Sequence, residues 1–334
     1  MSSGLVSICI PTYNGSSFLK RSLDSCLGQT YQDLEIIVND DCSSDDTKNI
    51  VKEYEEKDKR IKFSSNDQNL GLVGNWNATL NKATGSWIKI LFQDDFMEPN
   101  CIEEMMSVAQ LHPGSMVISK RSYVFDKEAP QDVIDYYKNK VVSLPASNPE
   151  QITYFTTSEI AELFIQNIGL NFIAEPSLVF FSKEMYRRSG IFDPDFLQVC
   201  DLEHTLRIAS LSGIIYLDKP LVHFAVHMCS TTSVNVSKNN FRIRFFETPI
   251  LINKINVKPV FDNLRKAFGS GDRLKLYLYT KLRAIEAEIV AGKNKEHREQ
   301  YADLLNKYPF MKIKVLEIVF LFPLFLYAKR RLTK

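Results

Sequence analysis

Short apolar runs alternate with amphipathic stretches along the first hundred residues. The apolar runs predict four buried strands, at Leu5–Ile10, Leu34–Val38, Ile61–Phe63 and Trp87–Phe92. The stretches between them predict three helices, at Phe18–Leu27, Asp46–Tyr54 and Val73–Ala83. Strands that alternate with helices predict an α/β fold with a mostly parallel, Rossmann-like central sheet that helices flank.

Adjacent carboxylates end two of these strands. Asp40 and Asp41 follow the second strand, and Asp94 and Asp95 follow the fourth. Open α/β sheets place their ligands at this edge. Two neighbouring carboxylates repel each other unless a cation binds them and joins them to an anionic group. A Mg²⁺ ion that also binds substrate phosphates is such a cation. Most Asp-Asp pairs are solvated turns or helix caps, so the preceding strand is what favours a site here.

The turn after the first strand lacks the glycines of the common phosphate-binding loops. It reads Pro11-Thr12-Tyr13-Asn14-Gly15, where a dinucleotide fold would have G-x-G-x-x-G and a P-loop G-x-x-x-x-G-K-[ST]. A bound diphosphate therefore needs another source of positive charge, and a metal ion at Asp94 and Asp95 is the obvious candidate.

Several motifs occur in an order that resembles a known family. They are the Val6–Asn14 segment, Gln29-Thr30-Tyr31, the Glu35–Thr47 segment, Asn69-Leu70-Gly71 and Gln93-Asp94-Asp95. Together they resemble family 2 glycosyltransferases of the GT-A fold, of the type that builds bacterial surface polysaccharide such as O-antigen. The resemblance implies inverting transfer of a hexosyl or N-acetylhexosaminyl group from a nucleoside diphosphate donor, most often a UDP-sugar, to an acceptor hydroxyl.

The resemblance also implies roles for the donor-binding residues. The nucleotide pocket is expected to be lined by Pro11, Thr12, Tyr13, Asn14, Asn69 and Gly71. Asp40 would accept a hydrogen bond from the base, Asp94 would face the ribose, and Asp95 would bind Mn²⁺ or Mg²⁺. Phe92 stands where the family often has a further Asp, a departure that affects the geometry of the metal site.

An inverting transfer needs a general base that takes the proton of the acceptor hydroxyl. The segment Phe196–Ala209 resembles the acidic motif of the family, and the match assigns the base to Asp201. Glu203, two residues on, would point to a different side of a helix. The alternative is that Asp201 only caps the helix predicted at Leu202–Leu211.

The segment Leu221–His227 alternates as a strand does. The resemblance makes His227 a candidate ligand of the metal or hydrogen-bond donor to the diphosphate, and a satisfied structural histidine is the alternative. His223 is four residues away, but a strand would not bring the two together as a zinc pair. Glu175 is a candidate for shaping the acceptor pocket, and a turn before a strand explains it equally well. The polar segment Arg121–Thr157 resembles a loop-rich insertion on the acceptor side.

The whole chain of 334 residues divides into a catalytic domain, residues 1–234, and a helical region, residues 235–334. The catalytic domain comprises a nucleotide-sugar half, 1–100, and an acceptor half, 101–234. A net charge of +1 gives no case for nucleic acid. Six scattered cysteines and no secretion signal favour reduced thiols and the cytoplasm.

The last residues, 310–334, contain an aromatic-rich apolar run followed by a basic end. The apolar run is too short to span a bilayer and is interrupted by Pro323. This pattern predicts peripheral contact with the inner face of the cell membrane, and a packed terminal helix is the alternative. The resemblance adds a polyprenyl-diphosphate-linked glycan as the expected acceptor. Two other classes stay open: a nucleotide-sugar-binding protein that has lost activity, and a sugar nucleotidyltransferase, which would need a basic, glycine-rich phosphate loop.

Overall fold

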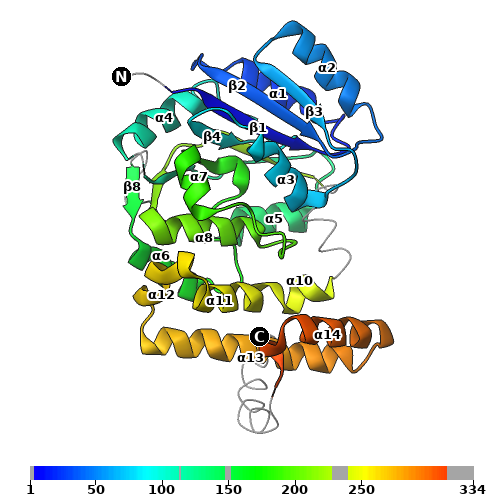
Figure 1. Cartoon of the computed structure of the whole chain (residues 1–334), viewed down its shortest axis with the longest axis vertical. Helices are drawn as coiled ribbons and strands as arrows, with labels where there is room; N and C mark the ends of the chain where they lie inside the picture. The colour runs from blue at the N-terminus through cyan, green and yellow to red at the C-terminus, as the bar shows by residue number, and fades with distance from the viewer. Residues whose placement is uncertain (1–3, 113, 147–151, 228–239, 314–334) are drawn as a thin grey trace.

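The computed structural model describes residues 4–112, 114–146, 152–227 and 240–313 (Figure 1). All four predicted N-terminal strands are present. They are β1 (Val6–Thr12), β2 (Leu34–Asp40), β3 (Ile61–Ser65) and β4 (Trp87–Ile90), which pair in parallel in the order β3-β2-β1-β4. All seven residues of β1 and of β2 are buried, as expected for strands covered on both faces. The predicted helices are α1 (Leu19–Leu27), α2 (Thr47–Lys57) and α3 (Gly71–Asn81).

The sheet continues beyond β4 with four more strands. They are β9 (Val179–Ser182), β6 (Met116–Ser119), β10 (Ile214–Leu217) and β8 (Ile152–Phe155), in that order. Strand β9 runs antiparallel to both β4 and β6, and β8 runs antiparallel to β10. Strand β10 is parallel to β6, so six of the eight strands run in one direction and the sheet is mostly parallel, as predicted, with β9 and β8 reversed.

A second, small sheet brings two distant segments to the end of β4. Its strands are β5 (Phe96–Met97), β11 (Val222–Val226) and β7 (Tyr123–Phe125). Residues Met97 and Phe96 of β5 pair with Val222 and His223 of β11. This pairing places the carboxylates that follow β4 beside the end of β11, where His227 follows the strand.

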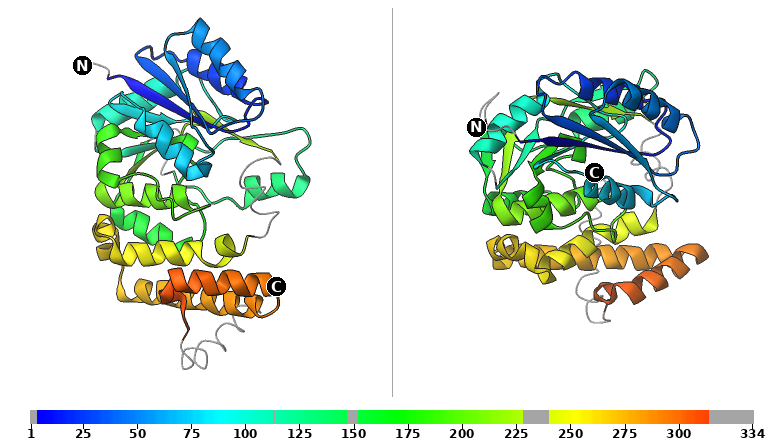
Figure 2. Two further views of the ribbon diagram at one scale, coloured as in Figure 1. Left: turned by 45° about the vertical axis from the view of Figure 1, so that its right-hand side comes forward. Right: turned by 45° about the horizontal axis from the view of Figure 1, so that its top comes forward.

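Helices flank the sheet and form further layers on one side of it (Figures 1 and 2). In the catalytic part they are α4 (Cys101–Leu111), α5 (Gln131–Asn139), α6 (Thr157–Gln166), α7 (Lys183–Ser189) and α8 (Cys200–Ser212), with the 3₁₀ turn η1 (Pro176–Leu178). The C-terminal helices are α10 (Phe241–Phe245), α11 (Glu247–Val257), α12 (Asp262–Ala267), α13 (Ser270–Ala291) and α14 (Lys295–Lys307), with η2 (Pro259–Phe261) and η3 (Pro309–Met311). The predicted helical C-terminal extension is thus present.

These C-terminal helices pack on the catalytic part. Helix α12 packs against α6 and α8, and α11 packs against α13. One continuous hydrophobic core includes Ile8 in β1, Phe261 in η2 and Met311 in η3, all fully buried. The two regions divided in the sequence at residues 234 and 235 therefore share one core.

None of the helices in the described part of the chain is both long and apolar enough to cross a bilayer. Most of the apolar and basic tail predicted to contact a membrane, from residue 314 on, lies outside the described residues. The five described cysteines are free, and four of them are buried.

Candidate active site

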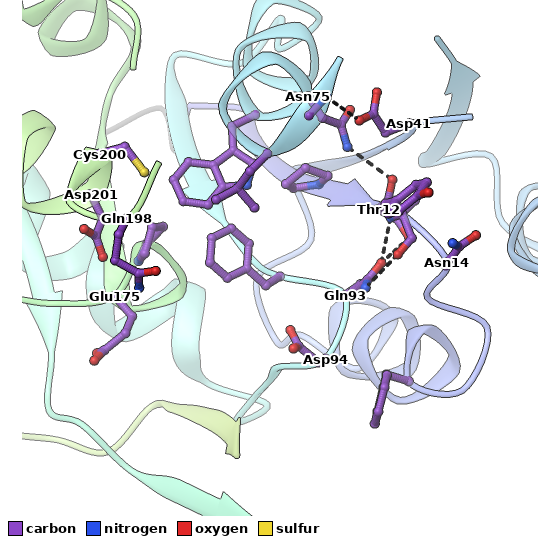
Figure 3. A pocket seen from close by; sticks show the side chains of 18 of the residues that line it. Thr12, Asn14, Asp41, Asn75, Gln93, Asp94, Glu175, Gln198, Cys200 and Asp201 are labelled. Atoms are coloured by element: carbon purple, nitrogen blue, oxygen red, sulfur yellow. Dashed lines mark hydrogen bonds between the residues drawn. The ribbon is translucent and has the colours of Figure 1, made fainter. Parts of the chain in front are cut away.

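A cavity of about 620 Å³ lies at the carboxyl ends of β1 and β4 (Figure 3). The turns after these strands, the N-termini of α3 and α8, the segment before η1 and the end of β11 contribute its lining. The lining residues that carry polar side chains are Thr12, Tyr13, Asn14, Asp41, Asn69, Asn75, Trp76, Gln93, Asp94, Glu175, Gln198, Cys200, Asp201 and His227. Parallel strands therefore deliver ligand-binding side chains at their carboxyl ends, as expected for this class of sheet.

The side of the cavity next to β1 is held in place by Gln93. Its Oε1 accepts hydrogen bonds from Thr12 Oγ1 at 2.6 Å and from the backbone N–H of Tyr13 at 2.9 Å, and its Nε2 donates to the Tyr13 carbonyl. The Tyr13 ring is about half exposed, so it is available to a flat ligand. The six residues predicted for the nucleotide pocket, Pro11, Thr12, Tyr13, Asn14, Asn69 and Gly71, all line this cavity.

The structure does not place Asp40 at the cavity. Asp40 is fully buried and accepts hydrogen bonds from the backbone N–H of Ser43 at 3.0 Å and from Ser65 Oγ at 3.0 Å. Its neighbour Asp41 lines the cavity, and its carboxylate accepts the backbone N–H groups of Leu70 and Gly71 at the start of α3. The prediction that Asp40 contacts the base does not fit this position, and Asp41, itself only 1% exposed, is the member of the pair that lines the cavity.

Asp94 and Asp95 also differ in position. Asp94 lines the cavity, and its Oδ2 lies 2.9 Å from His227 Nε2, so the segment after β4 and the end of β11 meet at Asp94 rather than at Asp95, which was predicted to share the metal with His227. The His227 ring stacks on Phe18, with ring centroids 4.4 Å apart. His223 instead lies 2.6 Å from Glu98 and is not among the residues that line the cavity, so the two histidines do not converge.

Asp95 is fully buried and does not line the cavity. Its Oδ1 accepts the backbone N–H of Ala225 in β11 at 2.9 Å. Burial and the nearby charge of Asp94 raise the pKa of Asp95 well above its ordinary value, although hydrogen bonds from Ser177 and Ala225 act in the other direction. The prediction that Asp95 binds the metal is therefore corrected: Asp95 joins β11 and η1 to the end of β4, and Asp94 is the accessible carboxylate.

A divalent cation fits the residues at this end of the cavity. Asp94 supplies one carboxylate and His227 an imidazole, and Mg²⁺ is commonly held by only one or two carboxylates together with substrate phosphates. Within the described residues, no three or more His, Cys, Asp or Glu side chains gather as a metal-binding group. The site therefore fits a cation that the donor diphosphate helps to bind, as the missing glycine-rich loop suggests.

On the opposite side of the cavity, Asp201 lies in the first turn of α8 (Figure 3). The residue that caps α8 is Val199, so the alternative of Asp201 as only an N-cap is wrong. Its carboxylate accepts hydrogen bonds from Asn171 Nδ2 at 2.9 Å and from the Leu202 backbone N–H. Burial, opposed mainly by the Leu202 hydrogen bond, raises the pKa of Asp201 to about 7. A carboxylate with a pKa near neutral is well suited to accept a proton.

The C-terminal region fixes the start of α8. Glu247, the first residue of α11, is fully buried, and its carboxylate accepts the backbone N–H groups of Leu197, Gln198 and Val199 at 2.5, 2.8 and 3.0 Å. These are the unpaired donors that precede a helix, and a carboxylate also matches the positive end of the helix dipole. Glu247 thereby holds the segment that carries Asp201 against the cavity.

Beside Asp201 lies an ion pair that the sequence did not predict. Arg121 Nε lies 2.9 Å from Glu175 Oε2, and the guanidinium also donates to the carbonyl groups of Asn171 and Val142. Glu175 lines the cavity, as suggested for the acceptor pocket. Asn171 bridges this pair to Asp201. Arg121 lies in the polar segment Arg121–Thr157, which has no motif of its own, and Asn171 lies in the segment that precedes Glu175; no sequence signal identified either residue.

Comparison with known proteins agrees with this geometry. Residues 7–159 match the model of Glycosyl transferase family 2. An uncharacterized glycosyltransferase of Haemophilus influenzae is 35% identical over 37% of this chain, and the match spans about half (49%) of that relative. The GalNAc(5)-diNAcBac-PP-undecaprenol beta-1,3-glucosyltransferase of Campylobacter jejuni is 37% identical over 31% of this chain and 34% of its own length.

Solved structures share the fold at low sequence identity. S. aureus TarS 1-349 in complex with UDP-GlcNAc superposes with a TM-score of 0.58 at 16% identity, over 84% of this chain and 80% of that one. The mannosyltransferase PcManGT from Pyrobaculum calidifontis in complex with GDP-Man and Mn²⁺ superposes with a TM-score of 0.52 at 17% identity, over 90% of this chain and 84% of that one. Residues 7–159 thus match the family that the motifs resemble, and the chain shares the GT-A fold of these glycosyltransferase structures.

Proposed function

We propose that this glycosyltransferase inverts the anomeric centre as it moves a hexosyl or N-acetylhexosaminyl group from a nucleoside diphosphate donor, most suitably a UDP-sugar, to an acceptor hydroxyl. The observation that carries the proposal is the arrangement of one cavity. Asp94 and His227 lie 2.9 Å apart in its lining, where they would meet the diphosphate, and Asp201 lies across the cavity from Thr12 and Asn14. A donor bound along β1 would present its anomeric carbon toward Asp201.

In this proposal, Asp201 is the general base. Its carboxylate takes the proton of the acceptor hydroxyl while that oxygen attacks the anomeric carbon, and the diphosphate leaves from the opposite face. A pKa of about 7 supports the role, because the group then has appreciable affinity for a proton and is still ionised in part at neutral pH. Arg121 and Asn171 hold the acceptor side, with Glu175 positioned to accept a hydrogen bond from the incoming sugar.

Asp94 and His227 would hold a Mn²⁺ or Mg²⁺ ion together with the diphosphate. When bound, this ion neutralises the charge that develops on the leaving diphosphate. The Mn²⁺ complex of the mannosyltransferase PcManGT supports the choice of cation. On the nucleotide side, Asp41 and the Tyr13 ring are the residues best placed to meet a base, and the UDP-GlcNAc complex of TarS supports a uridine donor.

The acceptor that fits best is a polyprenyl-diphosphate-linked glycan of bacterial polysaccharide synthesis, such as an O-antigen precursor. The Campylobacter relative named above, whose name includes an undecaprenol-linked substrate, supports this choice. Such an acceptor would put the enzyme in the cytoplasm, peripherally on the inner face of the membrane, with the tail at 310–334 as one contact. Nucleic acid is not a proposed partner.

The experiment is a screen of UDP-, GDP- and dTDP-sugars for release of the nucleoside diphosphate, with Mn²⁺, with Mg²⁺ and with a chelator. We expect slow release of UDP from a UDP-sugar that a divalent cation accelerates, because water can replace the missing acceptor. Stabilisation of the protein by a nucleotide sugar without any release would instead favour a binding protein that has lost activity. Formation of a sugar 1-phosphate when pyrophosphate is supplied would favour a nucleotidyltransferase.

A further inference from the structure

Charge is divided unevenly along this nearly neutral chain. Residues 1–240 contain 21 Lys and Arg and 31 Asp and Glu, a net charge of −10. Residues 241–313, which contain the C-terminal helices, have 15 Lys and Arg and 8 Asp and Glu, a net charge of +7. Such a division orients a protein at a charged surface, because one part is attracted while the other is repelled.

Helix α13 carries large apolar side chains on the outside of the basic part. The helix lies in the layer farthest from the sheet (Figures 1 and 2). Leu274, Tyr277 and Ile289 are 56%, 47% and 38% exposed, and the exposed side chains of Arg273 and Lys275 flank Leu274. Leu274 and Tyr277 lie about one turn apart on one side of the helix, whereas Ile289 lies farther along, beyond Lys281 and Ile285, which are buried on the same side.

The chain returns to the same helix just before its C-terminal tail. Lys281 Nζ donates to the carbonyl of Lys312 at 3.1 Å, and Ile313 packs on Leu278, Leu282 and Ile285. The tail, which begins at residue 314 and contains an aromatic-rich run and a basic end, therefore leaves the described structure at α13. Lys312 and Ile313 therefore cover part of this side of α13, next to the exposed Tyr277.

We propose that the exposed face of α13 is a docking surface for an anionic lipid bilayer. Apolar side chains flanked by cations suit the boundary between headgroups and acyl chains, and Lys and Arg near such a surface are attracted to its negative charge. A second copy of the chain is a poorer fit to this face, since two C-terminal regions that each have a net charge of +7 repel each other. The face would hold the acidic catalytic part away from the lipid, beyond the roughly 8 Å over which the surface charge acts at physiological salt.

The test is flotation of the full-length protein with phosphatidylcholine vesicles that contain or lack phosphatidylglycerol. The test variant is Leu274→Glu with Tyr277→Glu. The matched control is Leu111→Glu at the end of α4, where Leu111 is 72% exposed and lies in the acidic part of the chain. We expect the parent and the control to float with phosphatidylglycerol vesicles, and the double variant to bind them roughly ten-fold more weakly. High salt should release the parent in part.

Circular dichroism and donor hydrolysis in the absence of vesicles show whether the double variant is folded. Because donor hydrolysis needs no membrane, it tests the glycosyltransferase mechanism separately from the lipid surface. Equal flotation of the parent and the double variant would overturn the proposal and leave the tail as the membrane contact. Equal weakening by Leu111→Glu would also overturn it, because the effect would then be unspecific. A parent that forms a dimer which the double variant cannot form, with no change in flotation, would assign the face to self-association.

Discussion

Replacement of Asp201 by Asn should separate stability from activity in a pH-dependent way. The pKa of Asp201 is raised from 3.8 to about 7 mainly because the carboxyl is buried. At 1.36 kcal/mol per pH unit, this difference corresponds to about 4 kcal/mol. Between these two values the folded protein binds a proton that the unfolded chain has lost. The stabilisation from the neutral carboxyl is thus complete below about pH 4 and is lost as the pH rises to about 7.

The Asp201→Asn variant cannot ionise at this position, so it escapes that loss. In the variant, an NH₂ group replaces one of the two carboxylate oxygens. In the parent, Asn171 Nδ2 donates to one of these oxygens and the Leu202 N–H to the other, so one donor in the variant faces another donor. One unsatisfied or opposed donor costs about 1–3 kcal/mol. We therefore expect the variant to be less stable than the parent at pH 4 and as stable or more stable at pH 8, so that the two stability curves converge or cross.

The measurements are thermal unfolding of both proteins from pH 4 to pH 8.5, and cation-dependent UDP release over the same range. Parent activity should rise with pH up to about 7, and the variant should lose about 10²-fold or more of the turnover rate while it still binds donor. Asp67→Asn, at an exposed side chain, is the control for removing a charge. Parallel stability curves for parent and variant would refute the raised pKa, and normal turnover in the variant would refute the assignment of the base.

Three further predictions follow from the same geometry. Asp94→Asn should abolish the acceleration of UDP release by Mn²⁺. Asp95→Asn should keep most of this acceleration, because the buried amide oxygen can still accept the Ala225 N–H. The opposite result for the two variants would restore Asp95 as the metal ligand. Glu203→Gln breaks a buried ion pair with Arg207, so it should lower the free energy of unfolding by about 3 kcal/mol and leave the turnover of the folded enzyme nearly unchanged. A loss of turnover without a loss of stability would instead assign the base to Glu203. Glu247→Gln should lower both the melting temperature and the turnover rate without weakening donor binding, and weaker donor binding measured by calorimetry would contradict a role confined to α8.

The sequence predicts the strands of this fold well, because buried parallel strands are nearly continuous apolar runs. It also predicts that carboxylates gather at their ends. It fails to tell which member of a pair faces the cavity. Asp41 is the first residue after β2, and Asp94 and Asp95 lie four and five residues after β4, where the chain has left the strand and side chains no longer alternate between faces. Cys42, next to Asp41, has a φ of 63°, a conformation that no apolar pattern reveals.

The residues around Asp201 could not be predicted for a different reason. Arg121, Asn171 and Glu175 meet Asp201 from segments up to 80 residues apart, and antiparallel β9 brings the Glu175 segment beside β4. A long-range arrangement of this kind depends on the order of strands in the sheet, which alternating patterns do not encode. Asp201 was identified as the candidate base only because it lies in a motif that resembles the family.

The C-terminal helices link the candidate base to the proposed lipid surface, and this link limits how the two can be tested. Glu247 at the start of α11 holds the N-terminus of α8, and α11 packs in turn against α13. Deletion of residues 241–313 would remove both the support for Asp201 and the basic face, so a loss of activity on a lipid-linked acceptor would have two explanations. Substitutions on the outer face of α13 avoid this problem, because the side chains of Leu274 and Tyr277 are exposed whereas that of Glu247 is fully buried. If the double variant hydrolyses donor as the parent does but transfers poorly to an acceptor in vesicles, the helices serve transfer by placing the cavity at the membrane rather than by shaping it.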